Sequence, residues 1–253
     1  MPSVPLARAL SKLGLLSRRE AGPAIRAGRV RVNGRTIRDQ AYRVSLTRTS
    51  IVVDGQTVVP PEWRTILFNK PRGVVTTTRD PRGRPTVFDL LGPAGRGLKA
   101  VGRLDMASAG LLLLTSDPQL ANWLTNPVNA ISRTYVVTVR GRVDESALSS
   151  LMTGVVDRGE TLQAARVTPR KVSGRESHLI VELKEGKNRE IRRLFATIGH
   201  EVTRLTRIAF GPLHLGSLPS GAWRELARDD IARAFAGAGR RYLYRDGKTA
   251  VTS

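Results

Sequence analysis

The chain has 253 residues, a length that accommodates one mid-sized domain together with a smaller one. Lysine and arginine total 42 against 21 acidic residues, and the net charge of +21 points to a polyanionic partner such as nucleic acid. Cysteine is absent and the three histidines lack metal-ligand spacing, which excludes disulfides, thiolate catalysis and a zinc site built from such residues. No apolar run is long enough to span a membrane. We therefore expect a cytoplasmic protein with no metal, no cofactor and no membrane partner.

The N-terminal segment predicts two short helices. The first is indicated by three leucines at helical spacing, Leu6, Leu10 and Leu13, and it should end at Gly14. Ser17 and Glu20 have the spacing of a capping box, which would start the second helix. Pro23 would lie inside that helix, and an interior proline removes a backbone hydrogen bond, so we expect a kink or a late start there.

Short strands should follow these helices. Residues 29–35 and 50–58 are rich in β-branched residues and contain the turn pairs Asn33-Gly34 and Asp54-Gly55. Residues 1–60 also hold eleven cations against three acids, a surplus of eight positive charges. One basic face is expected to follow a phosphate backbone, and it consists of Arg18, Arg19, Arg26, Arg29 and Arg31. The alternatives are an ordinary solvated basic surface and, for the arginine excess as a whole, a base-composition bias of the genome.

The wording of this segment resembles a known RNA-binding module. L-A-R-A-L-S-K-L-G-L-L-S-R-R-E-A, then I-R-A-G-R-V-R-V-N-G-R and V-D-G, resembles the S4 RNA-binding domain in both order and spacing. The resemblance implies a small α/β domain over residues 1–59, with Gly22-Pro23 as a local departure. Two prolines then predict a linker at residues 60–62.

A second domain is expected over residues 63–235, ahead of a basic tail at 236–253. Its first strand leads to Lys70 and a basic loop, whose cations either contact phosphate or are simply solvated. Further along, Leu111–Leu114 predicts a buried strand, and Asp105 lies in the loop that enters it. Taken alone, an acid in the tetrapeptide G-R-L-D more often caps a turn.

The remaining elements alternate between strands and helices, which indicates an α+β domain. Strands are expected at residues 133–141, 162–172 and 177–183, with a helix capped by Asp144 at 144–152. Tyr135 lies in the first of these strands, a position where a tyrosine usually belongs to the core.

A last helix is expected to be capped by Asn188 and ended by Gly199. Its apolar face consists of Ile191, Leu194, Phe195 and Ile198. At about 100° per residue, Arg192 borders this face and Arg193 lies nearly opposite to it. Arg192 is therefore the candidate ion-pair partner of a carboxylate, whereas Arg193 should face RNA or solvent.

Several motifs of the second domain occur in one order that is typical of a single enzyme family. They are N-K-P-R-G-V-V-T-T, G-R-L-D followed by G-L-L-L-L-T-S-D, R-T-Y-V-V, E-G-K-N-R-E-I-R-R-L-F-A-T-I-G-H-E-V-x-R-L-x-R and G-P-L with L-P-S-G-A-W-R-E-L. Together they resemble the RsuA/RluB-type rRNA pseudouridine synthases, and their wording is nearest to the large-subunit RluB-like branch. The resemblance covers residues 6 to about 232. It implies that the S4 domain is followed along the chain by a mixed, mainly antiparallel sheet with flanking helices.

The resemblance also assigns roles to individual residues. Asp105 matches the family's essential aspartate, Tyr135 the tyrosine that packs against the target base, and Arg192 the basic partner of the aspartate. Arg103 and Leu104 match the loop that supports the aspartate and helps to hold the flipped nucleotide. Further contacts to RNA are expected at Lys70, Arg133, Lys187, Arg189 and Arg193. Met106 to Ala109 depart from the family's usual wording, and arginine stands at position 133 where lysine is common.

The function implied is conversion of one uridine of ribosomal RNA to pseudouridine by a bacterial enzyme, more specifically in the large subunit. The base leaves its stack, the C1′–N1 bond breaks, and C5 is joined to C1′ without a cofactor. The partner is ribosomal RNA or a ribosomal assembly intermediate, and the enzyme is expected to be a monomer. One alternative is a non-catalytic RNA-binding or ribosome-assembly factor built on an S4 module, which has no use for a carboxylate aimed at RNA. The other is a DNA-binding repressor, which the resemblance of the first helices to the S4 fold disfavours.

Overall fold

The computed structural model describes residues 3–13, 15–16, 18–45, 49–57 and 62–236. The chain forms two compact units, one made of Met1–Trp63 with Ser116–Pro118 and the other of Arg64–Thr115 with Gln119–Ser253. Most of the expected linker and, apart from its first residue, the expected basic tail lie outside the described residues. No helix of the described part is long and apolar enough to cross a membrane.

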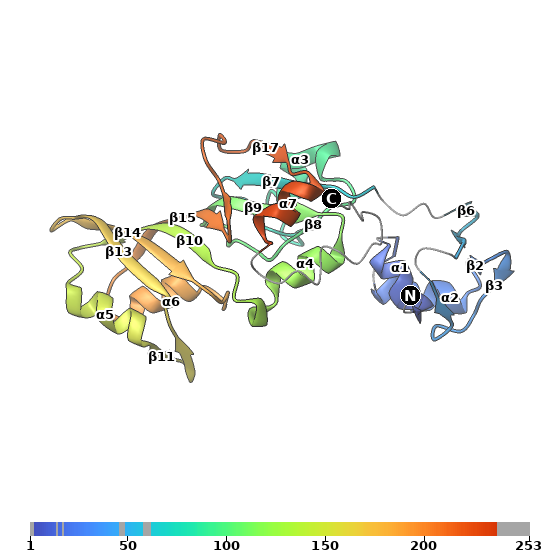
Figure 1. The fold of residues 1–253 in the computed structure, drawn as a ribbon, viewed down its shortest axis with the longest axis horizontal. Coiled ribbons are helices and arrows are strands. Elements are labelled where there is room, and N and C mark those ends of the chain that lie inside the picture. Colours follow the sequence, from blue (N-terminus) through green and yellow to red (C-terminus); the bar gives the residue numbers. More distant parts are fainter. Residues whose placement is uncertain (1–2, 14, 17, 46–48, 58–61, 237–253) are drawn as a thin grey trace, which may run out of the picture. The chain divides into compact units, whose positions relative to one another are not determined.

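The first unit combines two helices with short antiparallel strands (Figure 1). Its elements are β1 (Val4–Pro5), α1 (Leu6–Lys12), α2 (Arg18–Arg26), β2 (Val30–Val32), β3 (Arg35–Thr36), β4 (Arg43–Val44), β5 (Ile51–Val53) and β6 (Gln56–Thr57). The strands form a sheet in the order β3-β2-β5-β6 and a separate β1-β4 pair. The apolar helix faces pack on β2 and β5 in a core that includes Leu6, Leu10, Ile25 and Val30.

Both turn pairs occur where the sequence predicts them. Asn33 and Gly34 have φ values of 48° and 83°, and Asp54 and Gly55 have values of 51° and 81°. Two successive residues with positive φ are the signature of a type I′ hairpin turn. Of the kink or late start expected at Pro23, the late start is wrong, because α2 begins at Arg18 and contains Pro23.

The second unit is built on a mixed sheet of nine strands in the order β13-β14-β10-β15-β9-β7-β17, with β8 paired to β9 and β16 to β15. Neighbouring strands are antiparallel except β15 and β9, which are parallel. The strands are β7 (Thr65–Lys70), β8 (Lys99–Ala100), β9 (Ala109–Thr115), β10 (Arg133–Arg140), β13 (Arg166–Val172), β14 (Glu176–Leu183), β15 (Val202–Phe210), β16 (Leu213–His214) and β17 (Trp223–Glu225). A separate hairpin pairs β11 (Val155–Asp157) with β12 (Glu160–Leu162).

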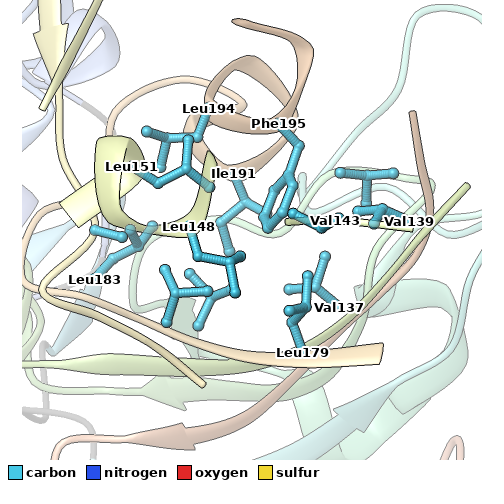
Figure 2. Packing of buried hydrophobic residues seen from close by; sticks show 14 of the residues in the cluster. Val137, Val139, Val143, Leu148, Leu151, Leu179, Leu183, Ile191, Leu194 and Phe195 are labelled. Atoms are coloured by element: carbon cyan, nitrogen blue, oxygen red, sulfur yellow. The ribbon is translucent and has the colours of Figure 1, made fainter. Parts of the chain in front are cut away.

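Helices flank this sheet. They are α3 (Val87–Leu91), α4 (Pro118–Thr125), α5 (Glu145–Thr153), α6 (Glu190–Thr197) and α7 (Arg228–Ala234), with short 3-10 turns η1 (Gly92–Gly95) and η2 (Pro127–Asn129). α5 and α6 lie against the part of the sheet that contains β13 and β14 (Figure 1). In Figure 2, Leu148 and Leu151 of α5 and Ile191 and Phe195 of α6 pack together over Val137 and other strand residues. The apolar stripe expected for the last helix is confirmed by this packing.

The start of α6 differs from the prediction. Asn188 does not cap the helix; the N-cap residue is Arg189, whose φ of 49° is left-handed and whose side chain makes no capping hydrogen bond. Instead, the Glu190 carboxylate accepts a hydrogen bond of 3.0 Å from the backbone N–H of Lys187. The left-handed conformation of Arg189 and the hydrogen bond of Glu190 thus take the place of the expected asparagine cap.

Candidate active site

A cleft of about 460 Å³ lies in the second unit where the loop before β9 meets β10, β15 and the segment before α6. Asp105 and Tyr135 both line it. The other residues expected to act on RNA that line the cleft are Arg103, Leu104, Arg133, Lys187 and Arg189. Segments far apart in the sequence therefore meet around one carboxylate.

The loop that carries Asp105 is held from several sides. The Thr76 hydroxyl donates to the Leu104 carbonyl at 2.8 Å and accepts from the Leu104 N–H at 3.3 Å. Leu104 itself is 6% exposed and belongs to the apolar core under the loop, whereas Arg103 is exposed. A backbone hydrogen bond of 3.0 Å from the Ser108 N–H to the Asp105 carbonyl closes the turn. Asp105 is thus presented to the cleft by a fixed backbone.

Lys70 does not contact RNA as the sequence suggests. Its side chain is fully buried, and its ammonium group donates to the carbonyls of Pro71, Asp105 and Ser108 at 2.9, 3.2 and 2.8 Å. Burial lowers the pKa of Lys70 to about 8, an effect that the nearby Asp105 carboxylate opposes. Lys70 therefore holds the Asp105 loop from the interior of the protein, and its ammonium group is not exposed to a phosphate.

Arg192 supports the same loop without forming the expected ion pair. Its guanidinium group donates to the Val202 carbonyl at 2.8 Å and to the Ala107 carbonyl at 3.4 Å, and no salt bridge joins it to Asp105 in the described part of the chain. Burial and the charge of Arg189 lower the pKa of Arg192, whereas Asp105 acts on it in the opposite sense. Arg192 is therefore an electrostatic neighbour of Asp105 that grips the loop through a backbone carbonyl.

Tyr135 lies on β10, directly across from Arg207 of β15. Its ring is partly buried and packs against both apolar cores of the unit. Because the ring also borders the cleft, it offers an aromatic surface to a planar base.

Cations in the segment before α6 have different environments. Arg189 is exposed beside the cleft. The Lys187 ammonium group donates to the Thr161 carbonyl and to Glu185 Oε1, each at 2.7 Å. Arg193 is not free to bind RNA, because it forms ion pairs with Asp157 and Glu160 and is only 14% exposed. It anchors the β11-β12 hairpin to α6.

Further cleft residues were not identified from the sequence, among them Arg207, Phe210 and Glu190. Arg207 and Phe210 come from the C-terminal half of β15, and Glu190 comes from the start of α6. Burial and Glu185 raise the pKa of Glu190 to about 7 against the effect of the Lys187 N–H. Only the motif wording around Arg207 signals its position; its burial is a property of the tertiary fold.

The basic residues of the first unit are placed on its surface. Arg19 and Arg26 are exposed, and the side chain of Arg18 lies outside the described residues. Arg29 is paired with Asp54, and Arg31 donates to the Gly34 carbonyl, although both remain exposed. No cluster of three or more side chains suited to a metal ion occurs in the described part of the chain.

The fold and cleft define an RNA-modifying enzyme. The RNA pseudouridylate synthase family model matches residues 64–197 and the S4 domain model matches residues 4–48, so the chain belongs to the RNA pseudouridylate synthases. An RNA pseudouridine synthase of Aquifex aeolicus is 35% identical over 97% of this chain and 99% of its own length.

Ribosomal large subunit pseudouridine synthase B of Salmonella typhi is 43% identical over 88% of this chain and 79% of its own length. A solved structure of a pseudouridylate synthase matches with a TM-score of 0.64 and 27% identity, covering 92% of this chain and all of that one. The mixed, mainly antiparallel sheet expected from the sequence is thus confirmed.

Proposed function

We propose that this enzyme converts a uridine of large-subunit ribosomal RNA to pseudouridine, with Asp105 as its reactive group. The observation that carries the proposal is the placement of Asp105 beside Tyr135 in a cleft of the catalytic unit. The name of the Salmonella typhi relative and the net charge of +21 support ribosomal RNA as the substrate. The enzyme is further proposed to act as a cytoplasmic monomer on ribosomal RNA or an assembly intermediate.

In this proposal, the target uridine leaves its stack and enters the cleft, where its ring packs on Tyr135. Unstacking costs a few kcal/mol, and packing on the aromatic ring returns about 1–3 kcal/mol of it. Asp105 then attacks as a nucleophile or removes the C2′ proton, and either start leads to cleavage of the C1′–N1 bond. The uracil turns and is joined to C1′ through C5.

The contacts of the loop explain why this carboxylate can act without a mobile partner. Lys70 and Arg192 reach the loop through backbone carbonyls, so they fix its path and leave the Asp105 carboxylate facing the cleft. Preorganisation of this kind contributes to catalysis because the backbone needs no rearrangement during the reaction.

The test is a base-resolved map of pseudouridine in ribosomal RNA from cells that lack the gene and from cells complemented with it. We expect one large-subunit position to lose its modification and to regain it with the wild-type chain. Asp105→Asn should fail to restore it, with a loss of at least about 10³-fold in vitro and RNA binding nearly unchanged. A map that does not change on deletion, or an Asp105→Asn protein that still restores the modification, would contradict the proposal.

A further inference from the structure

Two buried arginines form part of the cleft wall. Arg133 of β10 is 6% exposed and Arg207 of β15 is 3% exposed, and both line the cleft together with Asp105. Their guanidinium carbon atoms lie 5.0 and 5.2 Å from the centroid of the Phe210 ring. Positive charge is thus concentrated around one aromatic residue at the cleft.

Neither arginine has a carboxylate partner in the described part of the chain. Arg133 donates to the carbonyls of Ile131, Lys184 and Leu124. The Arg207 Nε donates to the Leu111 carbonyl at 2.7 Å, while its buried Nη2 has no hydrogen-bond partner among the described residues.

A buried guanidinium group without an anion is costly, because desolvation is not offset by an opposite charge. Burial lowers the pKa of Arg133, as does the charge of Arg207, and the acidic groups that oppose this are Tyr135 and Glu190. Burial holds the pKa of Glu190 at about 7, so near neutral pH it supplies only part of one negative charge against two positive ones. The charged residues that line the cleft are five cations (Arg103, Arg133, Lys187, Arg189 and Arg207) and three acids (Asp105, Glu185 and Glu190), so the lining carries a positive excess.

The proposed reaction generates an anion in this cleft. When the C1′–N1 bond breaks heterolytically, its electron pair stays on N1 and the detached uracil becomes an anion with charge on N1, O2 and O4. C1′ is satisfied either by a bond to the Asp105 carboxylate or by the C2′–H electron pair, with the proton passing to Asp105. When C5 later bonds to C1′, the C1′–Asp105 bond breaks and its electron pair returns to the carboxylate, or the C1′=C2′ double bond opens and C2′ takes its proton back from Asp105. The C5 proton is then lost and N1 gains a proton.

We propose that Arg207, reinforced by Arg133, stabilises the detached uracil anion in this cleft. The inference rests on the proposed function at Asp105. Arg207 is cross-strand to Tyr135, and its Nε is bonded to the strand that follows the Asp105 loop. Its guanidinium group therefore belongs to a cleft wall that the proposed base-stacking residue and the reactive carboxylate also line. A donor fixed at the site where charge develops typically accelerates a reaction by about 10²–10³-fold.

The experiment compares Arg207→Gln with the wild type in single-turnover reactions on one RNA fragment containing uridine or 5-fluorouridine at the target. Fluorine withdraws electrons and stabilises the uracil anion, so it replaces part of the stabilisation of that anion by Arg207. We expect Arg207→Gln to cleave the N-glycosidic bond of uridine about 10²-fold more slowly than the wild type does. On 5-fluorouridine, the loss of rate relative to the wild type should be smaller by at least about fivefold. Arg175→Gln, an exposed charge outside the cleft, should not alter the ratio between the two substrates.

An equal loss on both substrates, or no loss, overturns the proposal. If Arg207→Gln changes only RNA affinity and its salt dependence, Arg207 contacts a phosphate instead. A wild-type chain that forms no pseudouridine refutes the proposed function itself, which is a separate outcome.

Because Arg207→Gln can fail to fold, a second measurement leaves this arginine intact. The Asp105→Asn protein should bind free 5-fluorouracil more tightly as pH rises through the ionisation of that ring, as followed by ¹⁹F NMR. Tighter binding of the neutral ring would overturn the proposal.

Discussion

Tyr135 offers an aromatic ring to the cleft, and no hydrogen bond to its hydroxyl is found in the described part of the chain. If stacking is its role, Tyr135→Phe keeps the ring and should retain most of the activity. Tyr135→Ala removes the ring and should lose about 1–3 kcal/mol of transition-state stabilisation. Single-turnover rates on an RNA fragment measure both. A collapse of Tyr135→Phe to the level of Asp105→Asn would instead give the hydroxyl a direct part in the reaction.

Glu190 is a buried carboxyl group with a folded-state pKa of about 7, against an ordinary value of 4.5. Between these two values the folded state binds more protons than the unfolded state, so stability falls as pH rises toward 7. Glu190→Gln removes the titration. We expect the variant to gain stability relative to wild type by up to about 3 kcal/mol at pH 8, with a much smaller gain at pH 5.

Urea denaturation at both pH values measures this difference. Glu201→Gln is the matched control, because Glu201 is exposed and should give a difference that hardly depends on pH. The expectation for Glu190 fails if its variant shows the same offset from wild type at pH 5 and pH 8.

At the scale of single residues, the sequence motifs singled out Asp105 and Tyr135, and both line the cleft. The motifs did not show which of the cations are exposed. By residue type, Lys70 and Arg193 could each contact a phosphate. In the structure, however, Lys70 is buried and bound to backbone carbonyls, and Arg193 is paired with two acids more than thirty residues away in the sequence. Whether a positive charge faces solvent depends on tertiary neighbours that no local pattern identifies.

At the scale of elements, the parallel contact between β9 and β15 depends on one glycine. Gly110 has a φ of 103°, and a Cβ atom there would lie 2.2 Å from the Arg207 carbonyl oxygen. Gly110→Ala should therefore destabilise the protein by at least about 3 kcal/mol, because it adds backbone strain and a clash with another backbone.

The matched control for this prediction is Gly159→Ala. Gly159 has a φ of 78° with nothing within 4 Å of the added Cβ, so this variant bears the strain alone, about 1 kcal/mol. Urea denaturation of both proteins separates the two contributions. Equal stability of the two variants would show that β9 and β15 can move apart without cost.

Elements with a strong local signal were predicted well. Leu111–Leu114 lies within β9, and the apolar spacing of Ile191, Leu194 and Phe195 marks the buried face of α6. The cap of α6 was predicted incorrectly, because a left-handed Arg189 has no signature in residue type. Strand order could not be derived either, since β10 and β15 are brought together by packing over some seventy residues.

For the whole molecule, charge should govern RNA affinity. With a net charge of +21, binding to ribosomal RNA fragments is expected to weaken by about 10³-fold or more between about 50 and 200 mM salt. Fluorescence anisotropy at several salt concentrations measures the slope. Asp105→Asn should leave the slope unchanged, since it removes no cation. A nearly flat salt response would contradict recognition through the phosphate backbone.

The hydrogen bond from Arg207 to the Leu111 carbonyl spans 96 residues and joins the strand after the Asp105 loop to one made much later. Contacts at such separation form slowly, because the chain must close a long loop before it gains any stabilisation. During synthesis, the cleft stays incomplete until β15 has left the ribosome, because this strand supplies Leu205, Arg207 and Phe210 to its lining.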